Sequence, residues 1–178
     1  MAQTATVSPS APVARAWPYA SWAARVGARL IDELLLLIGV VPYVIGIVLL
    51  ITNSPGATSG GSTVAFSGSN GDPSMALAGL LLILLGGLLV FILWLWNRVF
   101  RMGRTGQSVG KGVMGLYLVS ERTGNPMGVG MCFVREIVHY VDGILYLGYL
   151  WPLWDAKRQT FADKIVSTVV AQGPRQEF

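Results

Sequence analysis

Residues 29–51 read RLIDELLLLIGVVPYVIGIVLLI, and the architecture of the whole chain follows from them. The last 18 of these residues, 34–51, carry no charge, whereas Arg29, Asp32 and Glu33 stand at their N-terminal edge. About 20 apolar residues in a helix suffice to cross the roughly 30 Å hydrocarbon core of a bilayer. We therefore expect a transmembrane helix over 22–51, with the three charged residues close to the membrane interface.

The composition of the chain is typical of an integral membrane protein. Hydrophobic residues make up 53% of the 178 residues and charged residues only 12%, whereas about a quarter of a soluble domain is charged. The net charge of +4 comes from basic residues that flank apolar segments, which argues against a nucleic-acid partner. One cysteine and one histidine form neither a disulfide nor a structural zinc site, and we expect no metal and no cofactor.

Alternating polar and apolar stretches divide the chain. We expect a disordered N-terminal tail over 1–18, a membrane domain over 19–171 and a short tail over 172–178. Within the membrane domain the expected segments are the first helix 22–51, a loop 52–74, a second helix 75–96, a basic segment 97–127, a third apolar segment 128–154 and a C-terminal segment 155–171. The loop is rich in Gly, Ser and Thr and carries one charge, Asp72.

Basic residues set the expected orientation. The loop between the first two helices has none, while Arg25 and Arg29 lie at the start of the first helix. The residues that follow the second helix include Arg98, Arg101, Arg104 and Lys111. The positive-inside rule therefore places the N terminus and the basic segment in the cytoplasm, with the protein in the cell membrane. We also consider these four residues as contacts for anionic lipids.

The third apolar segment, 128–154, is about long enough for one crossing and too short for two. One crossing would put Lys157, Arg158 and Lys164 outside, against the positive-inside rule. We therefore favour a segment that enters the membrane shallowly and returns, which leaves the C terminus cytoplasmic. A third full span with an external tail stays open as the alternative.

Two short runs rich in β-branched residues, 112–120 and 165–171, predict strands. A sheet needs both strands on one side of the membrane and outside the hydrocarbon. The expected fold is thus an all-α membrane protein with two full transmembrane helices, a third interfacial, re-entrant or spanning helical segment, and a small cytoplasmic two-stranded β element.

Charged residues share one helical face on two segments. Arg25, Arg29 and Asp32 follow one another at helical spacing, and Arg135, His139 and Asp142 do the same on the third segment. A charge inside a bilayer is costly and marks a candidate functional site. We predict that Arg29 pairs with Asp142 and that Arg135 pairs with Asp32. The secondary candidates are Arg25, Glu33, Glu136, Asp155 and Asp163.

The order of these motifs resembles the RDD family of bacterial membrane proteins over about 19–171. The resemblance rests on the charges of the first helix, on Asp142, on GQSVGKGVMGLYLVS at 106–120 and on DAKRQTFADKIVSTVVA at 155–171. The resemblance implies that the family's arginine and two aspartates are Arg29, Asp32 and Asp142, with Arg25 as a rival for the arginine. Many members read Leu-His-Asp where this chain has Phe161, Ala162 and Asp163. We therefore expect no proton relay through that position.

Two functions agree with these observations. The resemblance implies transport of an ion or small solute, in which a carboxylate exchanges its arginine for a proton or cation and His139 tunes proton occupancy. With so few helices, such a protein would form a homo-oligomer or join a larger membrane complex. The alternative is a non-catalytic membrane partner or assembly subunit whose charged faces hold helices together. We expect no enzyme, because no nucleophile is placed to use the single histidine and 106–112 lacks the spacing of a phosphate-binding loop.

Overall fold

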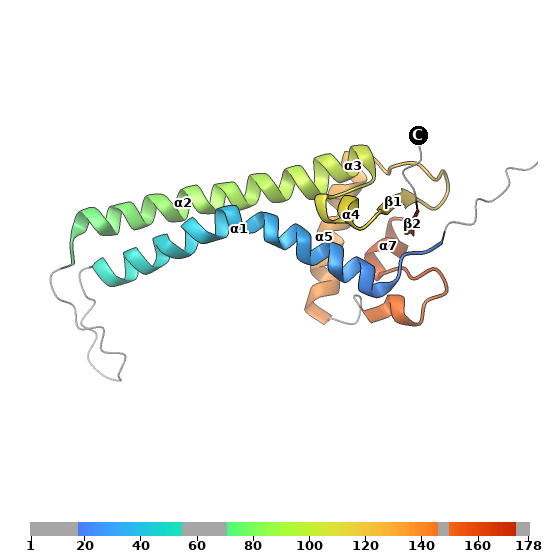
Figure 1. The fold of residues 1–178 in the computed structure, drawn as a ribbon, viewed down its shortest axis with the longest axis horizontal. Coiled ribbons are helices and arrows are strands. Elements are labelled where there is room, and N and C mark those ends of the chain that lie inside the picture. The colour runs from blue at the N-terminus through green and yellow to red at the C-terminus, as the bar shows by residue number, and fades with distance from the viewer. Residues whose placement is uncertain (1–17, 55–70, 146–149, 174–178) are drawn as a thin grey trace, which may run out of the picture.

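The computed structural model describes residues 18–54, 71–145 and 150–173, with side chains throughout these ranges except at 140–145. Two long helices lie side by side, and the other described elements gather at one end of this pair (Figure 1). Helix α1 spans Trp22–Asn53 and α2 spans Pro73–Leu95. Both are long and apolar enough to cross a membrane, as the sequence predicts. The middle of the expected loop, 55–70, lies outside the described residues.

The second long helix does not stop where the sequence analysis ends it. It continues through the π-helix η1, Trp96–Arg101, and then through α3, Met102–Thr105. The first part of the expected basic segment 97–127 is therefore helical. The reason is that Val99 and Met102 find buried positions here and that no proline interrupts residues 74–106. Gly106 ends the helix with a left-handed backbone, φ +71°.

Glycines bring the two long helices into close contact. A Cβ atom built on Gly39 would lie 2.8 Å from the backbone oxygen of Gly86, and one built on Gly46 would lie 2.6 Å from that of Gly79. The order of these pairs shows that α1 and α2 run antiparallel. Small residues let membrane helices approach closely, and the close approach maximises van der Waals contact.

Gly86→Ala is expected to destabilise the helix pair by about 1–3 kcal/mol, the usual cost of forcing a methyl group into a packed interface. The new Cβ would lie 2.6 Å from the backbone nitrogen of Tyr43. Gly87→Ala is the matched control, because its Cβ would meet only the Tyr43 ring at 3.9 Å. Denaturant unfolding in detergent micelles compares the stabilities of the two variants. Equal stabilities would contradict close packing of α1 against α2 at Gly86.

The remaining elements form a compact end domain. They are α4, Val109–Val113; β1, Leu116–Ser120; α5, Val129–Leu145; the 3-10 helix η2, Trp151–Leu153; α7, Phe161–Ile165; and β2, Thr168–Gln172. Strands β1 and β2 pair antiparallel in a register that runs from Leu116 opposite Gln172 to Ser120 opposite Thr168. The predicted two-stranded element is therefore present.

Both strands are shorter or shifted relative to the predicted runs 112–120 and 165–171. Residues 109–113 are helical because the Ser108 hydroxyl accepts a hydrogen bond from the Lys111 backbone and caps α4. Thr160 and Asp163 form a capping box that starts α7, which takes in Ile165. At the other end β2 extends to Gln172, one residue into the expected tail.

The start of α1 and the end of the chain lie together. Tyr19 forms a bridge with Ala171, and the Ala20 nitrogen donates to the Val170 oxygen at 2.9 Å. Residues 18–20, which include the last residue of the expected tail 1–18, thus form one edge of the small sheet. A cluster of buried apolar residues joins this edge to the helices: Ala20, Ala24, Ala28, Met102, Leu116, Leu118, Cys132 and Val170.

Helix α5 runs across the ends of α1 and α2 instead of alongside them (Figure 1). Its 17 residues span about 26 Å, less than the hydrocarbon core of a bilayer. One face, with Cys132, Arg135 and Glu136, is buried, while Phe133 and Ile137 are exposed. This is the pattern of a helix with one polar, packed face and one apolar, open face.

Candidate functional site

A pocket of about 420 Å³ lies where the start of α1 meets the end domain. Elements far apart in sequence contribute its walls, because the small sheet holds the end of the chain beside residues 18–20. Its basic lining residues are Arg25, Arg29, Arg98, Lys111 and Arg135. Asp32, Glu136 and His139 also line it, together with apolar side chains from α1 and from the segment before α7.

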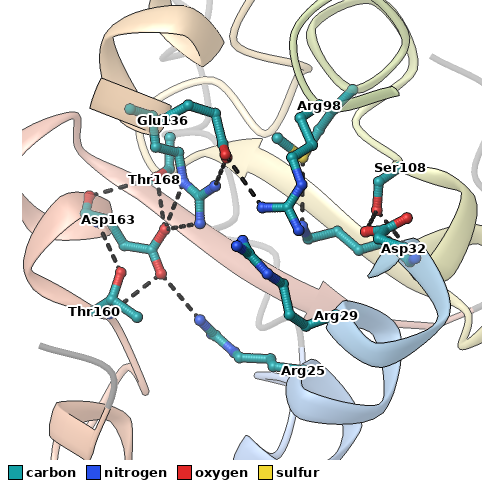
Figure 2. Close-up of polar contacts among 12 residues, drawn as sticks. Arg25, Arg29, Asp32, Arg98, Ser108, Glu136, Thr160, Asp163 and Thr168 are labelled. Atoms are coloured by element: carbon teal, nitrogen blue, oxygen red, sulfur yellow. Dashed lines mark hydrogen bonds and ion pairs between the residues drawn. The ribbon is translucent and has the colours of Figure 1, made fainter. Parts of the chain in front are cut away.

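Asp163 is the centre of the polar contacts on one side of the pocket (Figure 2). Its fully buried carboxylate accepts from Arg25 Nη1 at 2.9 Å and from Arg135 Nε and Nη2 at 2.9 and 2.8 Å. The Thr160 backbone nitrogen donates to it at 3.2 Å. Burial alone raises the pKa of Asp163, but the charges of Arg135 and Arg25 outweigh this effect and hold the pKa well below its usual range.

The charged contacts continue from Asp163 as an alternating chain. Arg135 lies 3.4 Å from Glu136, and Glu136 lies 3.2 Å from Arg98. Glu33 then accepts from Arg98 at 3.1 Å and from Arg29 at 2.8 Å. We call this set the charge chain; its members are Arg25, Asp163, Arg135, Glu136, Arg98, Glu33 and Arg29. It connects α1, η1, α5 and α7, and it is mostly buried, so loss of one partner leaves another charge uncompensated.

Asp32 lies outside the charge chain. Its carboxylate accepts from Asn97 Nδ2 at 2.8 Å, from Ser108 Oγ at 2.6 Å and from the Gly110 backbone nitrogen at 2.7 Å. The predicted pair between Arg135 and Asp32 is therefore wrong, because neutral donors around the first turn of α4 satisfy this carboxylate. Arg135 turns instead to Asp163 and Glu136.

The π-helix η1 places two adjacent residues in the interior. Asn97 donates to Asp32 and accepts from the Val109 nitrogen at 2.7 Å, while Arg98 bridges Glu33 and Glu136. A π-turn carries more residues than an α-turn, which changes the direction in which neighbouring side chains leave the helix. The sequence does not identify Asn97 and Ser108 as site residues, because a polar residue near the end of an apolar helix gives no sign of its partner.

The other predicted residues occupy different environments. Arg29 is 47% exposed at the rim, where it pairs with Glu33, while its rival Arg25 is buried against Asp163. The side chain of Asp142 lies outside the described residues, so its predicted pair with Arg29 stays a prediction. Asp155 pairs with Lys164, away from the pocket lining. Arg101 donates to the Gln107 backbone oxygen and Arg104 is exposed, so neither lines the pocket.

His139 lies with the charge chain. It is buried, it lines the pocket, and its charge is among those that lower the pKa of Asp163. The structure thus brings Arg25, Arg135, Glu136, His139 and Asp163 together, and the shared face on α5 predicts this for Arg135 and His139. In the described part of the chain, no group of three or more His, Cys, Asp or Glu side chains is placed to hold a metal ion.

Two basic residues of the pocket retain unused hydrogen-bond donors. Lys111 Nζ contacts Met102 Sδ at 3.4 Å and pairs with no carboxylate within the described ranges. Burial lowers the pKa of Lys111 to about 8. Arg25 donates through Nη1 alone, since its Nε and Nη2 atoms are buried and have no hydrogen-bond partner among the residues described. The described part of the pocket therefore has more hydrogen-bond donors than acceptors.

Comparisons with known proteins agree with this architecture. Residues 19–167 match the RDD family. The proline-rich antigen homolog of Mycobacterium tuberculosis (strain ATCC 25618 / H37Rv) is 49% identical over 89 residues, which are 49% of this chain and 36% of that protein. The proline-rich antigen of Mycobacterium leprae (strain TN) is 53% identical over 75 residues, 42% of this chain and 30% of that protein.

The aligned region covers about a third of the length of these curated relatives. No solved structure matches the chain. The family match extends over most of the described residues, from the bridge at Tyr19 to the turn before β2, and it includes the whole charge chain. The chain therefore belongs to the RDD family.

Proposed function

We propose that this RDD protein binds a small anion in the basic pocket and serves as a subunit of a membrane transporter. The observation that carries the proposal is the surplus of hydrogen-bond donors at Lys111 and Arg25. An anion in the pocket would accept from both residues, and charge-assisted hydrogen bonds of this kind are among the strongest in proteins.

An anion fits the lining better than a cation does. Among the described side chains, two carboxylates, Asp32 and Glu136, line the pocket, against five basic residues. Asp32 already accepts from three donors, and Glu136 lies between Arg98 and Arg135. A cation would have to displace these donors, whereas an anion adds to them. Exchange of a cation or proton at a carboxylate, the mechanism considered from sequence, therefore has less support than anion binding.

The positions of the start of α1 and of the end of the described chain support a cytoplasmic pocket. Strand β2 lies beside residues 18–20, so the start of α1 and the end of the described chain share one side of the membrane. The basic residues of the charge chain belong to that side, as the positive-inside rule favours for the cytoplasm. In this orientation α5 lies in the interface with its apolar face toward lipid.

Transport requires more than one protomer. Only two described helices are long and apolar enough to span, and they pack against each other through glycines. A path for a solute would therefore form between copies of the chain or between this chain and another membrane subunit. If the protein binds the anion but does not transport it, the alternative function applies, that of a membrane partner or assembly subunit.

Lys111→Met is expected to weaken sulfate binding about tenfold or more, because a charge-assisted hydrogen bond contributes about 1.5–3 kcal/mol. Sulfate is a suitable probe since its charge does not change near neutral pH. Calorimetric titration of the detergent-solubilised full chain measures the affinity. Wild-type binding should also weaken as the pH rises through about 8, where Lys111 loses its proton, and Lys111→Arg should remove that step.

Arg104→Gln is the control, because Arg104 is exposed and outside the pocket. It should bind sulfate like the wild type. Proteoliposomes then test transport with the same set of variants, and uptake of labelled sulfate or phosphate should fall in Lys111→Met alone. If wild type binds neither anion, the proposed function fails; binding without uptake removes the transport part.

A further inference from the structure

The geometry points to a more specific ligand, and this inference rests on the proposed function. We propose that the pocket takes the phosphate headgroup of an amphiphile, whose hydrocarbon chain leaves the pocket along α1 into the bilayer. The pocket would then be a lipid-headgroup site that opens sideways to the membrane, and the transported or held molecule would be an anionic lipid or a lipid-linked phosphate.

One wall of the pocket is apolar and continuous with the outer surface of α1. Val26 and Leu30 line the pocket and are exposed, Leu30 by 61%. Further exposed apolar residues follow at helical spacing along the same helix: Leu34, Leu37, Ile38, Val41, Ile45 and Val48. Leu150 lines the pocket and is exposed as well. An acyl chain that leaves between α1 and Leu150 would therefore stay on apolar surface all the way.

The polar wall suits a phosphate. Arg25, Arg29 and Arg98 direct their guanidinium groups toward the space between Asp163, Glu136 and Asp32 (Figure 2). A phosphate group has several acceptor oxygens, which match the two unused donors of Arg25 and the ammonium of Lys111. Inorganic phosphate would satisfy these donors but would leave the apolar wall in contact with water. A molecule with one anionic and one apolar end satisfies both walls.

The place of the pocket along the membrane normal fits the same ligand. It lies at the end of α1 where Trp22 and the arginines precede the long apolar run, and Trp and Arg are typical of the headgroup zone. Its volume of about 420 Å³ is in the range of small-ligand sites, roughly 300–1,000 Å³, which leaves room for a headgroup and the first methylene groups.

Titration calorimetry of the full chain in nonionic detergent tests this ligand. The titrants are dihexanoyl phosphatidic acid, inorganic phosphate and zwitterionic dihexanoyl phosphatidylcholine. We expect phosphatidic acid to bind at least about tenfold more tightly than inorganic phosphate, because burying two methylene groups is worth about that factor. Phosphatidylcholine should bind at least about tenfold more weakly than phosphatidic acid, since its choline carries a positive charge into a basic pocket.

Two leucine variants test where the acyl chain of the ligand lies. Leu30→Asn should lower the affinity for phosphatidic acid toward that for inorganic phosphate, and it should change the affinity for phosphatidic acid more than that for phosphate. Leu84→Asn on α2 is the matched control, since Leu84 is 62% exposed but does not line the pocket, and it should behave like wild type. Lys111→Met should weaken both phosphate ligands.

The outcomes separate this inference from the proposed function. Equal affinities for phosphate and phosphatidic acid, or equal losses in Leu30→Asn and Leu84→Asn, overturn the amphiphile and leave a site for a free anion. Equal affinities for phosphatidic acid and phosphatidylcholine overturn the anionic headgroup. Binding of neither sulfate nor any phosphate ligand overturns both proposals.

Discussion

Asp163→Asn is expected to destabilise the end domain by about 3–5 kcal/mol, the usual cost of removing one partner from a buried ion pair. The carboxylate is fully buried and compensates two arginines, Arg25 and Arg135. It also completes the capping box of α7 with Thr160. An amide keeps the size of the side chain but leaves Arg25 without its counter-charge and Arg135 with Glu136 alone. Denaturant unfolding in detergent, followed by tryptophan fluorescence, measures the loss.

Asp155→Asn provides the control, because Asp155 pairs with the partly exposed Lys164, where such a pair contributes about 0–1 kcal/mol. The pH dependence gives a second readout. Since the pKa of Asp163 is lowered in the folded protein, its contribution to stability is present above the ordinary carboxyl value of 3.8 and is lost as the pH falls through the folded value. The Asn variant should lack this acid-dependent part, and an unchanged stability profile would contradict the central role of Asp163.

Asp32→Ala is expected to cost about 2–4 kcal/mol, because three buried donors would lose their acceptor. These donors belong to Asn97, Ser108 and Gly110, which hold α4 against α1. Asp32→Asn should cost less, since its amide oxygen can still accept from Asn97 and Gly110. The same unfolding measurement ranks the two variants.

Glu33→Gln is the neighbour to compare with Asp32→Ala, because Glu33 has a 46% exposed side chain and partly exposed ion pairs contribute little. Its cost should stay below about 1 kcal/mol. If Glu33→Gln proves as damaging as Asp32→Ala, the stability of this end of α1 resides in the charge chain and not in the contacts of Asp32 with α4.

Much of the fold follows from local sequence pattern. Uncharged runs predict α1 and α2 to within a few residues, and the β-branched runs predict the small sheet. The polar faces of Arg25 on α1 and Arg135 on α5 predict that both side chains point into a polar region, where the structure joins them through Asp163 of α7. The capping box was readable as Thr160 followed three residues later by Asp163, and it would have placed Asp163 in a structured turn.

The partners of each charge do not follow from such patterns. Periodicity indicates which face of a helix is polar, but Asp32 contacts Asn97 and Gly110, 65 and 78 residues away. These contacts depend on η1, whose π-turn has no sequence signature here, and on the return of the chain through β2. Charge complementarity alone therefore pairs Asp32 with the wrong residue, Arg135, because the same set of charges can be paired in several ways.

The contact of residues 18–20 with β2 also constrains the order of events during synthesis. Arg25 and Asp163 are separated by 138 residues, so a ribosome working at about 5–20 residues per second needs roughly 7–28 s between them. Throughout that interval α1 has already been synthesised, while Arg25 lacks its carboxylate partner, Asp163. The sheet can close only after residues 168–172 have been made, so a product that ends before Asp163 would contain both long apolar helices and still carry an uncompensated charge at Arg25.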